Sequence, residues 1–301
     1  MNYVQATDDY LMYLQVEKNY SVNTLTSYAF DLKLYGDFLT ANDRSLDLDE
    51  LTSSSVRRFV QDQVINHNIK PRTLQRRISC LKSFSKYCMK ENYMKSDFTA
   101  GIQAPKSDKN LPKYMTLQEL HKLFTFLEHD PRPQRIRNEL MIKLLATTGM
   151  RRQELVDLTW EQVNLENHTI LVRGKGKKER LLPLHPIVLP LFQVYKETLL
   201  EQQKHYSEPI FYNQKNKPLN PRGLHKIFKE ILERAGLPAH RFSLHHLRHT
   251  FASLLLQENK DKVDLRTLQE LLGHESLATT SMYTHIDFEQ KKKAINSFLI
   301  S

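Results

Sequence analysis

Apolar residues recur at helical spacing through most of the first hundred residues. Ser21 and Asn23 stand where the second apolar segment needs an N-cap, and Pro71 suits the first turn of the fourth, where proline sacrifices no helical hydrogen bond. The pattern therefore predicts a small bundle of four helices. The apolar segments cover residues 10–14, 25–39, 54–66 and 71–94.

The fourth segment is amphipathic and strongly basic on its polar face. With a turn of about 100° per residue, several cationic positions fall within about 40° of Arg72, and the apolar positions gather on the opposite side. Residues 53–95 hold ten Lys or Arg but only two acids, Asp62 and Glu91. A solvated helix face is the alternative, but a basic stripe at this spacing matches the phosphates of a duplex. The candidate DNA contacts are Arg72, Arg76, Lys86 and Lys90.

The helical pattern stops in residues 99–112, which read TAGIQAPKSDKNLP. Gly101, Pro105 and Pro112 break any helix there, and no apolar period remains. The stretch predicts a linker between an N-terminal helical domain of residues 1–105 and a second domain of residues 106–301. A chain of 301 residues is long enough for two separate cores.

The second domain mixes helical and alternating patterns. Thr116 and Glu119 form a capping box, and the apolar helix that follows the next turn ends at Gly149. Alternating segments predict strands, with a turn at residues 174–178 between the last two. The predicted fold class is mainly α with a small antiparallel β-sheet. Strands are expected at 160–163, 169–173, 179–184 and 210–212, and helices at 138–147, 187–203 and 222–235.

Histidines and an arginine gather in residues 243–286. On a helix, His245, Arg248 and His249 stand at i, i+3 and i+4, so their side chains leave one face. Ordinary core packing requires no such group. The spacing therefore indicates a chemical site on this face, with scattered surface histidines of a helical bundle as the alternative.

A short helix over residues 265–272 is predicted to end at Gly273, which suits a left-handed C-cap, and to leave His274 at a turn. Ser276 can cap a third short helix that carries Tyr283 at its end. Tyr283 lies nine residues after His274, so its phenol can return toward the arginine and the histidines.

Charge and composition indicate what kind of partner the protein binds. Lys and Arg exceed Asp and Glu by 44 to 34, with a pI of about 9.4, which favours a polyanionic partner. Cys80 and Cys88 are roughly 12 Å apart on the predicted helix, too far for a disulfide, so both are expected to be reduced thiols. The N-terminus has no signal-peptide pattern and no apolar run approaches the roughly 18 residues of a membrane span. A cytoplasmic protein is expected.

The second domain presents, in chain order, an arginine after a helix-ending glycine, a lysine in a hairpin turn, an H-x-x-R pair, another histidine and a late tyrosine. With that order the chain resembles the tyrosine recombinase (phage integrase) family, in its Xer-like or mobile-element integrase and resolvase branch, over nearly its whole length. The matching blocks are TTGMRRQELVDL at 147–158, VRGKGKKERLLPL at 172–184, LHHLRHTFASLL at 244–255 and LLGHESLATTSMYTHI at 271–286.

The resemblance implies an N-terminal SAM-like core-binding domain and a mixed α/β catalytic domain. It also implies that Glu154, in the first block, is a buried group that supports the reacting residues without touching the substrate. Met150, Gln153 and Leu254 depart from residues common in the Xer branch, which leaves the branch open but removes no reacting group. The implied catalytic residues are Arg151, Lys175, His245, Arg248, His274 and Tyr283.

These residue types fit phosphodiester chemistry. Attack by Tyr283 on phosphorus adds charge to the non-bridging oxygens, which the guanidiniums of Arg151 and Arg248 can bind. Lys175 can protonate the departing 5′-oxygen, and the two implied histidines can serve the phenol as base or hydrogen-bond partner. The phosphotyrosine bond conserves the energy of the broken linkage. Rejoining therefore needs no ATP, and neither a metal nor another cofactor is expected.

Other classes of function remain as alternatives. A zinc site built on His245, His249 and His274 is conceivable, but the helix lacks the glutamate of H-E-x-x-H and carries an arginine between the ligands. A non-catalytic DNA-binding regulator would leave Arg151 and Tyr283 without a purpose. A type IB topoisomerase would share the chemistry but act without paired sites.

Strand exchange defines the expected partners. Two duplexes with paired half-sites need four active sites, so a homotetramer on synapsed double-stranded DNA is expected, with a paralogous recombinase or an accessory protein as open additions and no membrane partner. Residues 294–300 form an apolar segment at helical spacing that must dock on its own domain or on a neighbour. The family resemblance favours the neighbour.

Overall fold

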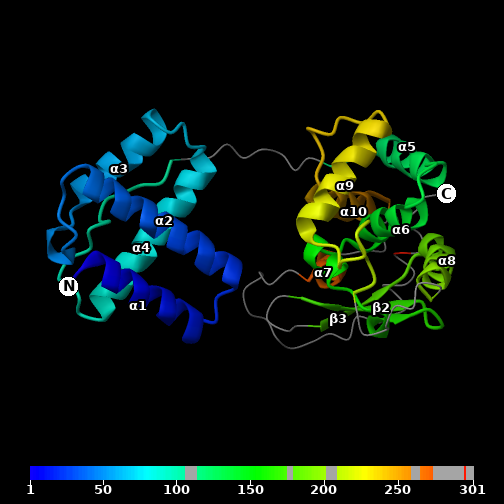
Figure 1. The fold of residues 1–301 in the computed structure, drawn as a ribbon, viewed down its shortest axis with the longest axis horizontal. Helices are drawn as coiled ribbons and strands as arrows, with labels where there is room; N and C mark the ends of the chain where they lie inside the picture. The colour runs from blue at the N-terminus through cyan, green and yellow to red at the C-terminus, as the bar shows by residue number, and fades with distance from the viewer. Residues whose placement is uncertain (106–113, 175–178, 201–208, 259–264, 274–294, 296–301) are drawn as a thin grey trace. The chain divides into compact units, whose positions relative to one another are not determined.

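The computed structural model describes residues 1–301 except 106–113, 175–178, 201–208, 259–264, 274–294 and 296–301. The chain divides into two compact units, Met1–Asn110 and Leu111–Ser301 (Figure 1). The predicted boundary between residues 105 and 106 stays a prediction. Most of the predicted linker, from residue 106 onward, lies outside the described residues.

The first unit contains the four predicted helices. Ser21 caps the second helix, since its Oγ accepts a hydrogen bond from the amide of Thr24 at 3.4 Å, whereas Asn23 lies inside that helix. Pro71 is the first residue of the fourth helix, as predicted. The elements are α1 (Tyr3–Val16), α2 (Val22–Ala41), the 3-10 turn η1 (Leu48–Glu50), α3 (Ser53–Ile65) and α4 (Pro71–Lys90).

Aromatic rings fill the core of this bundle. The rings of Tyr10 and Phe84 meet edge to face with centroids 5.5 Å apart, and Tyr10 Oη donates to Ser83 Oγ at 2.7 Å. Cys80 and Cys88 are buried free thiols, as predicted, and burial raises the pKa of both. The apolar face of α4 is therefore the inner wall of the bundle.

The chain that follows α4 remains attached to the first unit. Phe98 and Ile102 are buried in its core. Gln75 Nε2 donates to the carbonyl of Pro105 at 2.7 Å. The segment therefore packs on the bundle as far as Pro105, although its sequence has no regular period.

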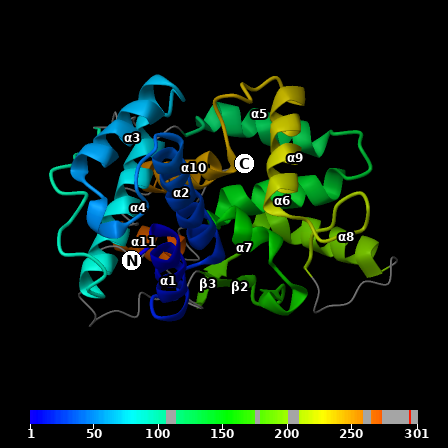
Figure 2. The same ribbon diagram turned by 60° about the vertical axis from the view of Figure 1, so that its left-hand side comes forward.

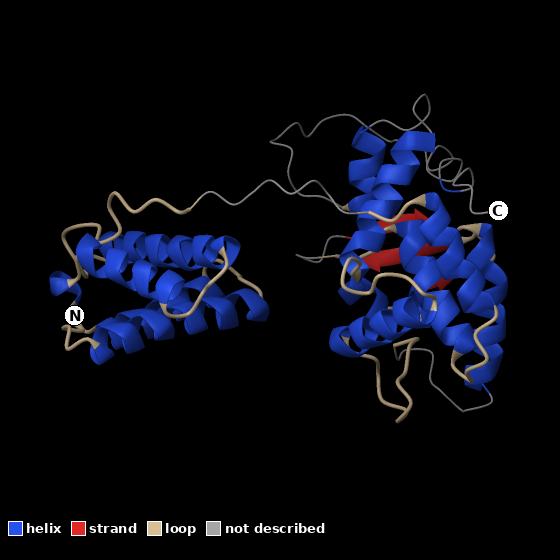
Figure 3. Cartoon of the chain, turned by 90° about the horizontal axis from the view of Figure 1, so that it is seen from above, coloured by secondary structure: helices blue, strands red, loops and turns tan. Residues whose placement is uncertain are grey.

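The second unit combines helices with one small sheet (Figure 3). Thr116 and Glu119 form the predicted capping box at the start of α5. The helices are α5 (Leu117–Glu128), α6 (Arg135–Thr148), α7 (Arg152–Val156), α8 (Leu189–Leu200), α9 (Pro221–Arg234), α10 (Leu244–Glu258) and α11 (Leu265–Leu272), with 3-10 turns η2 (Trp160–Gln162) and η4 (Pro186–Val188).

The sheet has three antiparallel strands in the order β1-β2-β3, which confirms the predicted fold class. Its strands are β1 (Val163–Asn164), β2 (Thr169–Arg173) and β3 (Glu179–Pro183). In the hairpin of β2 and β3, Arg173 pairs with Glu179 and Thr169 with Pro183.

Two predicted strands are corrected. Residues 160–162 form a 3-10 turn, because the amide of Thr159 donates to Gln162 Oε1 at 3.0 Å and closes the chain into a turn. Residues 210–212 are buried but form no strand. Their flanking contacts are isolated bridges that involve Pro209 and Pro218, and proline has no N–H with which to extend a ladder.

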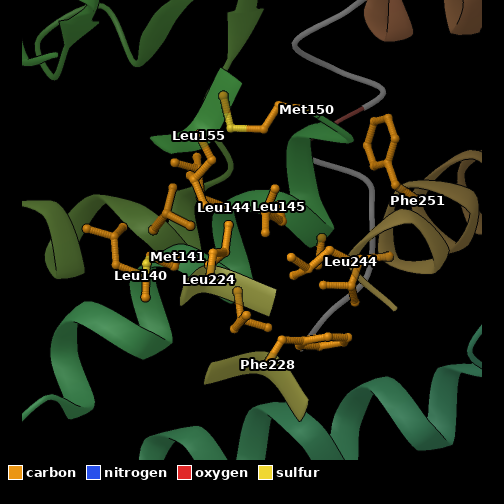
Figure 4. Close-up of a cluster of buried hydrophobic side chains, with 14 of the residues drawn as sticks. Leu140, Met141, Leu144, Leu145, Met150, Leu155, Leu224, Phe228, Leu244 and Phe251 are labelled. Carbon is orange, nitrogen blue, oxygen red and sulfur yellow. The ribbon is translucent and has the colours of Figure 1, made fainter. Parts of the chain in front are cut away.

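Helix α6 lies at the centre of the second unit. It contacts α5, α8 and α10 and is buried over most of its length (Figure 2). Its apolar side chains join those of α9 and α10 in one cluster, seen in Figure 4 with Leu144, Phe228 and Phe251 among its members. This core fixes the positions at which α6 ends and α10 begins.

Candidate active site

The turn after α6 is held at one glycine. Gly149 is the C-cap of α6 with a φ of 62°, in the left-handed region. A Cβ at this position would come within 2.5 Å of Phe251 Cδ1 and 2.9 Å of Leu272 Cδ2. Only glycine fits both the backbone conformation and the close approach of α10 and α11. The turn delivers Arg151 to the start of α7.

Glu154 in α7 anchors Arg151, the N-cap of that helix. The Glu154 side chain is 4% exposed and accepts from the Arg151 amide at 2.7 Å and from Arg151 Nη1 at 2.8 Å. A second arginine, Arg180 on β3, donates to both carboxylate oxygens, at 2.9 and 2.7 Å. The buried carboxylate is thus shared by two guanidiniums.

This pairing determines the protonation state of Glu154. Burial raises the pKa of the carboxyl, but the hydrogen bonds from Arg180 and Arg151 and the charge of Arg180 outweigh it and lower the pKa below 4.5. Glu154 is therefore ionised at neutral pH. Its negative charge holds both arginine side chains in place.

Arg248 is fixed by main-chain carbonyls. Its residue is 5% exposed, with Nη1 donating to Gly149 O at 2.6 Å and Nη2 to Leu272 O at 2.5 Å. Burial, with help from the neighbouring charge of Arg151, lowers the pKa of Arg248 to about 10. The guanidinium remains cationic at neutral pH.

Three arginines converge on the C-terminal end of α11. The carbonyl of Leu271 accepts from Arg180 Nε at 3.0 Å, that of Leu272 from Arg248, and that of Gly273 from Arg151 Nη2 at 2.9 Å. The last carbonyls of a helix lack intrahelical partners and carry partial negative charge, so cations stabilise them. Elements from four parts of the chain are thereby fixed around one point.

The histidines of α10 lie beside Arg248. The rings of His245 and His249 meet edge to face with centroids 4.5 Å apart. Burial and the charge of Arg248 lower the pKa of His249, so its neutral form is favoured. His246 accepts a hydrogen bond at Nδ1 from the amide of Ser243 at 3.1 Å, at the start of the helix.

An open cleft of about 470 Å³ lies at the meeting point of α7, α9 and α10. Cationic and imidazole side chains form much of its polar wall. Such a wall favours an anion, and two fixed guanidiniums match the paired oxygens of a phosphate diester. Its polar lining residues include Arg151, Arg152, His225, Ser243, His245 and Arg248.

Family models match both units of the chain. The family model described as "Phage integrase family" matches residues 113–290, and that described as "Phage integrase, N-terminal SAM-like domain" matches residues 7–92. The chain belongs to the phage integrase family. It is accordingly a tyrosine recombinase, an enzyme of site-specific DNA recombination, as the sequence predicted.

Curated relatives of this recombinase cover nearly its whole length. Tyrosine recombinase XerC of Oceanobacillus iheyensis is 35% identical over 291 residues, which are 95% of this chain and 93% of the relative. Tyrosine recombinase XerD of Staphylococcus aureus is 34% identical over 299 residues, 97% of each chain. The recombinase is therefore related to both Xer groups to nearly the same degree.

Solved structures share the fold. XerH site-specific recombinase bound to a palindromic difH substrate, in a post-cleavage complex, has a TM-score of 0.71 and 28% identity, and the match covers 86% of this chain and 75% of XerH. The lambda integrase (75–356) dimer bound to a COC′ core site has a TM-score of 0.69 and 19% identity, covering 95% and 100%.

The structure brings together three of the residues predicted for catalysis. Arg151, His245 and Arg248 line the same cleft. The other three, Lys175, His274 and Tyr283, lie outside the described residues, and so does Ser276 with the short helix predicted behind it. The chemical roles of all six remain predictions.

Arg180 is the residue that sequence reasoning missed. A signal was present, because side chains alternate along a strand and Arg180 shares a face with Leu182, which is buried. A cation at an inward position needs a partner inside the protein. Its partner, Glu154, lies 26 residues earlier, and the alternation alone does not identify it.

The basic stripe of α4 is only partly open to solvent. Arg72, Lys86 and Lys90 are exposed, but Arg76 forms an ion pair with the buried Asp31 of α2 at 2.5 Å and donates to Ser27 O at 3.2 Å. Arg76 is therefore paired with a buried carboxylate of α2, unlike the other three predicted DNA contacts in the described part of the chain.

Grouped metal ligands and membrane-spanning helices are both absent from the described residues. Within the described residues, no three His, Cys, Asp or Glu side chains are grouped as metal ligands would be. His274, which the zinc alternative required, lies outside the described residues. No helix in the described part of the chain has the length and apolar content to cross a membrane.

Proposed function

We propose that this recombinase cleaves one DNA strand through Tyr283 and holds the broken end as a 3′-phosphotyrosyl intermediate. The Tyr283 oxygen forms a bond to phosphorus, and the bond from phosphorus to the 5′-oxygen breaks. A 5′-hydroxyl of another strand then attacks the phosphotyrosine and restores a diester. Bond energy is conserved in each step, so neither ATP nor a metal enters the scheme.

The placement of two arginines on one cleft carries this proposal. Main-chain carbonyls hold Arg151 at Nη2 and Arg248 at both Nη atoms, and Glu154 holds Arg151 at Nη1. Within the described residues each Nη atom uses one of its two N–H groups, which leaves the second N–H for a ligand. Those hydrogens can bind the non-bridging oxygens, whose charge grows in the pentacoordinate state. Because the guanidiniums are fixed before DNA arrives, little reorganisation is needed during the reaction.

Proton transfers are assigned to the remaining predicted residues. The phenol proton of Tyr283 passes to His245 or His274, and Lys175 donates a proton to the departing 5′-oxygen. His245 is exposed on the cleft side of α10, as a residue that must meet DNA should be. His249, which is partly buried with a lowered pKa, is assigned to support of the His245 ring.

The decisive experiment replaces the nucleophile. A DNA site is first selected from a random duplex library with Tyr283→Phe protein, which should bind but not cut. A nicked suicide duplex with the selected sequence is then incubated with both proteins. The wild-type chain should form a covalent adduct on a denaturing gel and Tyr283→Phe none. An adduct of undiminished yield with Tyr283→Phe would exclude Tyr283 as nucleophile.

Assembly follows from the chemistry. Exchange between two duplexes with paired half-sites needs four active sites, so we place four copies of this chain on synapsed DNA. The solved relatives include a lambda integrase dimer on a core site and a lambda integrase tetramer on a Holliday junction. A paralogous recombinase can replace two of the four copies, since XerC and XerD relatives match equally well.

The two units are proposed to clamp opposite sides of the duplex. The exposed cations of α4 then lie in or beside a major groove, where they contact phosphates. The cleft of the second unit receives the scissile phosphate. Integration or excision of mobile DNA and resolution of joined chromosomes are both served by this reaction, and the DNA site selected above distinguishes them.

A further inference from the structure

Arg180 does not line the cleft, but it binds Glu154, the carboxylate that holds the cleft residue Arg151. Its side chain is 13% exposed, and all its described hydrogen bonds go to two groups. Both Nη atoms donate to the Glu154 carboxylate, and Nε donates to the carbonyl of Leu271. A Cβ on Gly273 would come within 3.2 Å of Arg180 Nη1, so glycine at this position leaves the guanidinium its space.

Glu154 presents a problem for any reaction at this site. In the described part of the chain it is the only acid paired with Arg151, and its carboxylate is buried. A carboxylate and a phosphate bind a guanidinium through the same two-pronged geometry, so they compete for it. A buried carboxylate with no other cation would draw Arg151 into a complete two-pronged pair.

The observed geometry avoids that capture. The Arg180 guanidinium binds both carboxylate oxygens, while the Arg151 guanidinium binds Glu154 only through Nη1 and directs Nη2 to Gly273 O. The Arg151 side chain remains 41% exposed at the cleft. Arg180 therefore supplies the positive charge that Glu154 would otherwise take wholly from Arg151.

We propose that Arg180 is a positioning residue for strand cleavage: by neutralising Glu154, it lets this carboxylate orient Arg151 without withdrawing it from the scissile phosphate. Its bond to Leu271 O links the same interaction to the last turn of α11. The proposal rests on the proposed function. It predicts that Arg180 affects the cleavage step more than the binding of DNA.

The test uses the full-length chain and the nicked suicide duplex with the selected site, at saturating protein. Arg180→Met should lower the single-turnover cleavage rate by roughly 10- to 100-fold, the cost of a misplaced reacting group. Binding to the same duplex should stay within about twofold of wild type, the scatter of independent changes. Arg180→Lys keeps the charge but loses the two-pronged guanidinium. Its cleavage rate should lie between those of wild type and Arg180→Met.

The second variant separates positioning from folding. If Arg180 acts by neutralising Glu154, then adding Glu154→Gln to Arg180→Met removes the surplus negative charge and should recover part of the cleavage rate. If Arg180 only supports the fold, the double variant is as slow as Arg180→Met or slower. That outcome, or a wild-type cleavage rate in Arg180→Met, overturns the inference.

Lys143→Met is the matched control. Lys143 is a buried cation, 3% exposed, on the buried carboxylate of Glu139, which Arg135 shares, and it does not line the cleft. It should lose thermal stability as Arg180→Met does but cleave at the wild-type rate. Equal loss of cleavage in Lys143→Met would assign the effect to folding. Absence of an adduct with the wild-type chain would instead overturn the proposed function.

Discussion

At the scale of a single residue, the ionisation of Glu154 makes the stability of the protein depend on pH. Its pKa lies below its ordinary value of 4.5, so it contributes stability above pH 4.5 that is lost as the pH falls through the lowered pKa. Glu154→Gln should remove this contribution. The variant leaves Arg180 buried without its counter-charge, which should cost about 3 kcal/mol at neutral pH.

Denaturant unfolding of both proteins from pH 7 downward checks this prediction. The difference in unfolding free energy between wild type and Glu154→Gln should be constant at neutral pH and shrink below about pH 4.5, because only the wild type has this carboxylate to protonate. A difference that stays constant through the acid range would show that Glu154 does not titrate as proposed.

Individual residues also show where sequence reasoning ends. The spacing of His245, Arg248 and His249 on one helix was predictable, because local periodicity determines which side chains share a face. The partners of Arg76 were not. Arg76 looks like a member of an exposed stripe on α4, but Asp31 lies 45 residues earlier on another helix, and only the packing of the bundle brings the two together.

At the scale of elements, we expect one added methyl group in the turn from α6 to α7 to destabilise the protein strongly. Gly149→Ala places a Cβ against Phe251 and Leu272 with φ in the left-handed region. We expect a loss of about 2 to 6 kcal/mol in unfolding free energy, since strained backbone and overpacking each cost about 1 to 3 kcal/mol.

Gly236→Ala is the control variant that measures the cost of backbone strain without overpacking. Gly236 has a φ of 63° in the same unit, but its added Cβ would meet only the end of the flexible Lys122 side chain, at 3.2 Å. This variant should lose about 1 kcal/mol, the cost of a left-handed residue that is not glycine. Equal losses at Gly149 and Gly236 would mean that α10 and α11 do not press on the turn.

Helix α4 gives a second prediction at this scale. Arg72 is exposed and has no ion pair among the described residues, whereas Arg76 is paired with Asp31. If both side chains contact DNA phosphates, Arg72→Gln should reduce the slope of log affinity against log salt by about 0.9, the value for one phosphate contact. Arg76→Gln should reduce that slope by less. Equal slopes for wild type and Arg72→Gln would argue against this face.

The sequence predicted elements correctly where the apolar period extends over many residues. Its predictions failed for segments of only a few residues. The four helices of the first unit and the β2–β3 hairpin follow directly from apolar spacing and capping residues. Residues 160–162 alternate like a strand, but a side-chain bond between Thr159 and Gln162 closes them into a turn. Prolines 209 and 218 likewise prevent a ladder beside residues 210–212.

At the scale of the whole molecule, the burial of Ile295 bears on the predicted docking of the C-terminal segment. Ile295 is fully buried and belongs to the core cluster of its own second unit. In the single chain this residue therefore docks on its own domain, the alternative to the neighbour that the family resemblance favours. Docking on a neighbour in an assembly requires that this contact be exchanged.

Ile295→Ala tests the contact within one chain. Removing buried methyl groups should lower the unfolding free energy of the DNA-free protein by about 2 to 5 kcal/mol. The loss should not depend on protein concentration, because a contact within one chain is insensitive to dilution, whereas a contact between chains weakens. A stability identical to wild type at high dilution would show that Ile295 has no partner in its own chain.

Deletion of residues 290–301 extends the test to assembly. If this segment also passes to a neighbour on DNA, the shortened chain should bind a single site with near-normal affinity but lose cooperative binding to paired sites and recombination. Gel shifts on one and on two half-sites, together with a recombination assay, measure the three quantities. The shortened protein should lose about as much stability as Ile295→Ala. It should therefore remain folded at the assay temperature. Synapsis and recombination at the wild-type rate in the shortened protein would mean that the segment serves only its own domain.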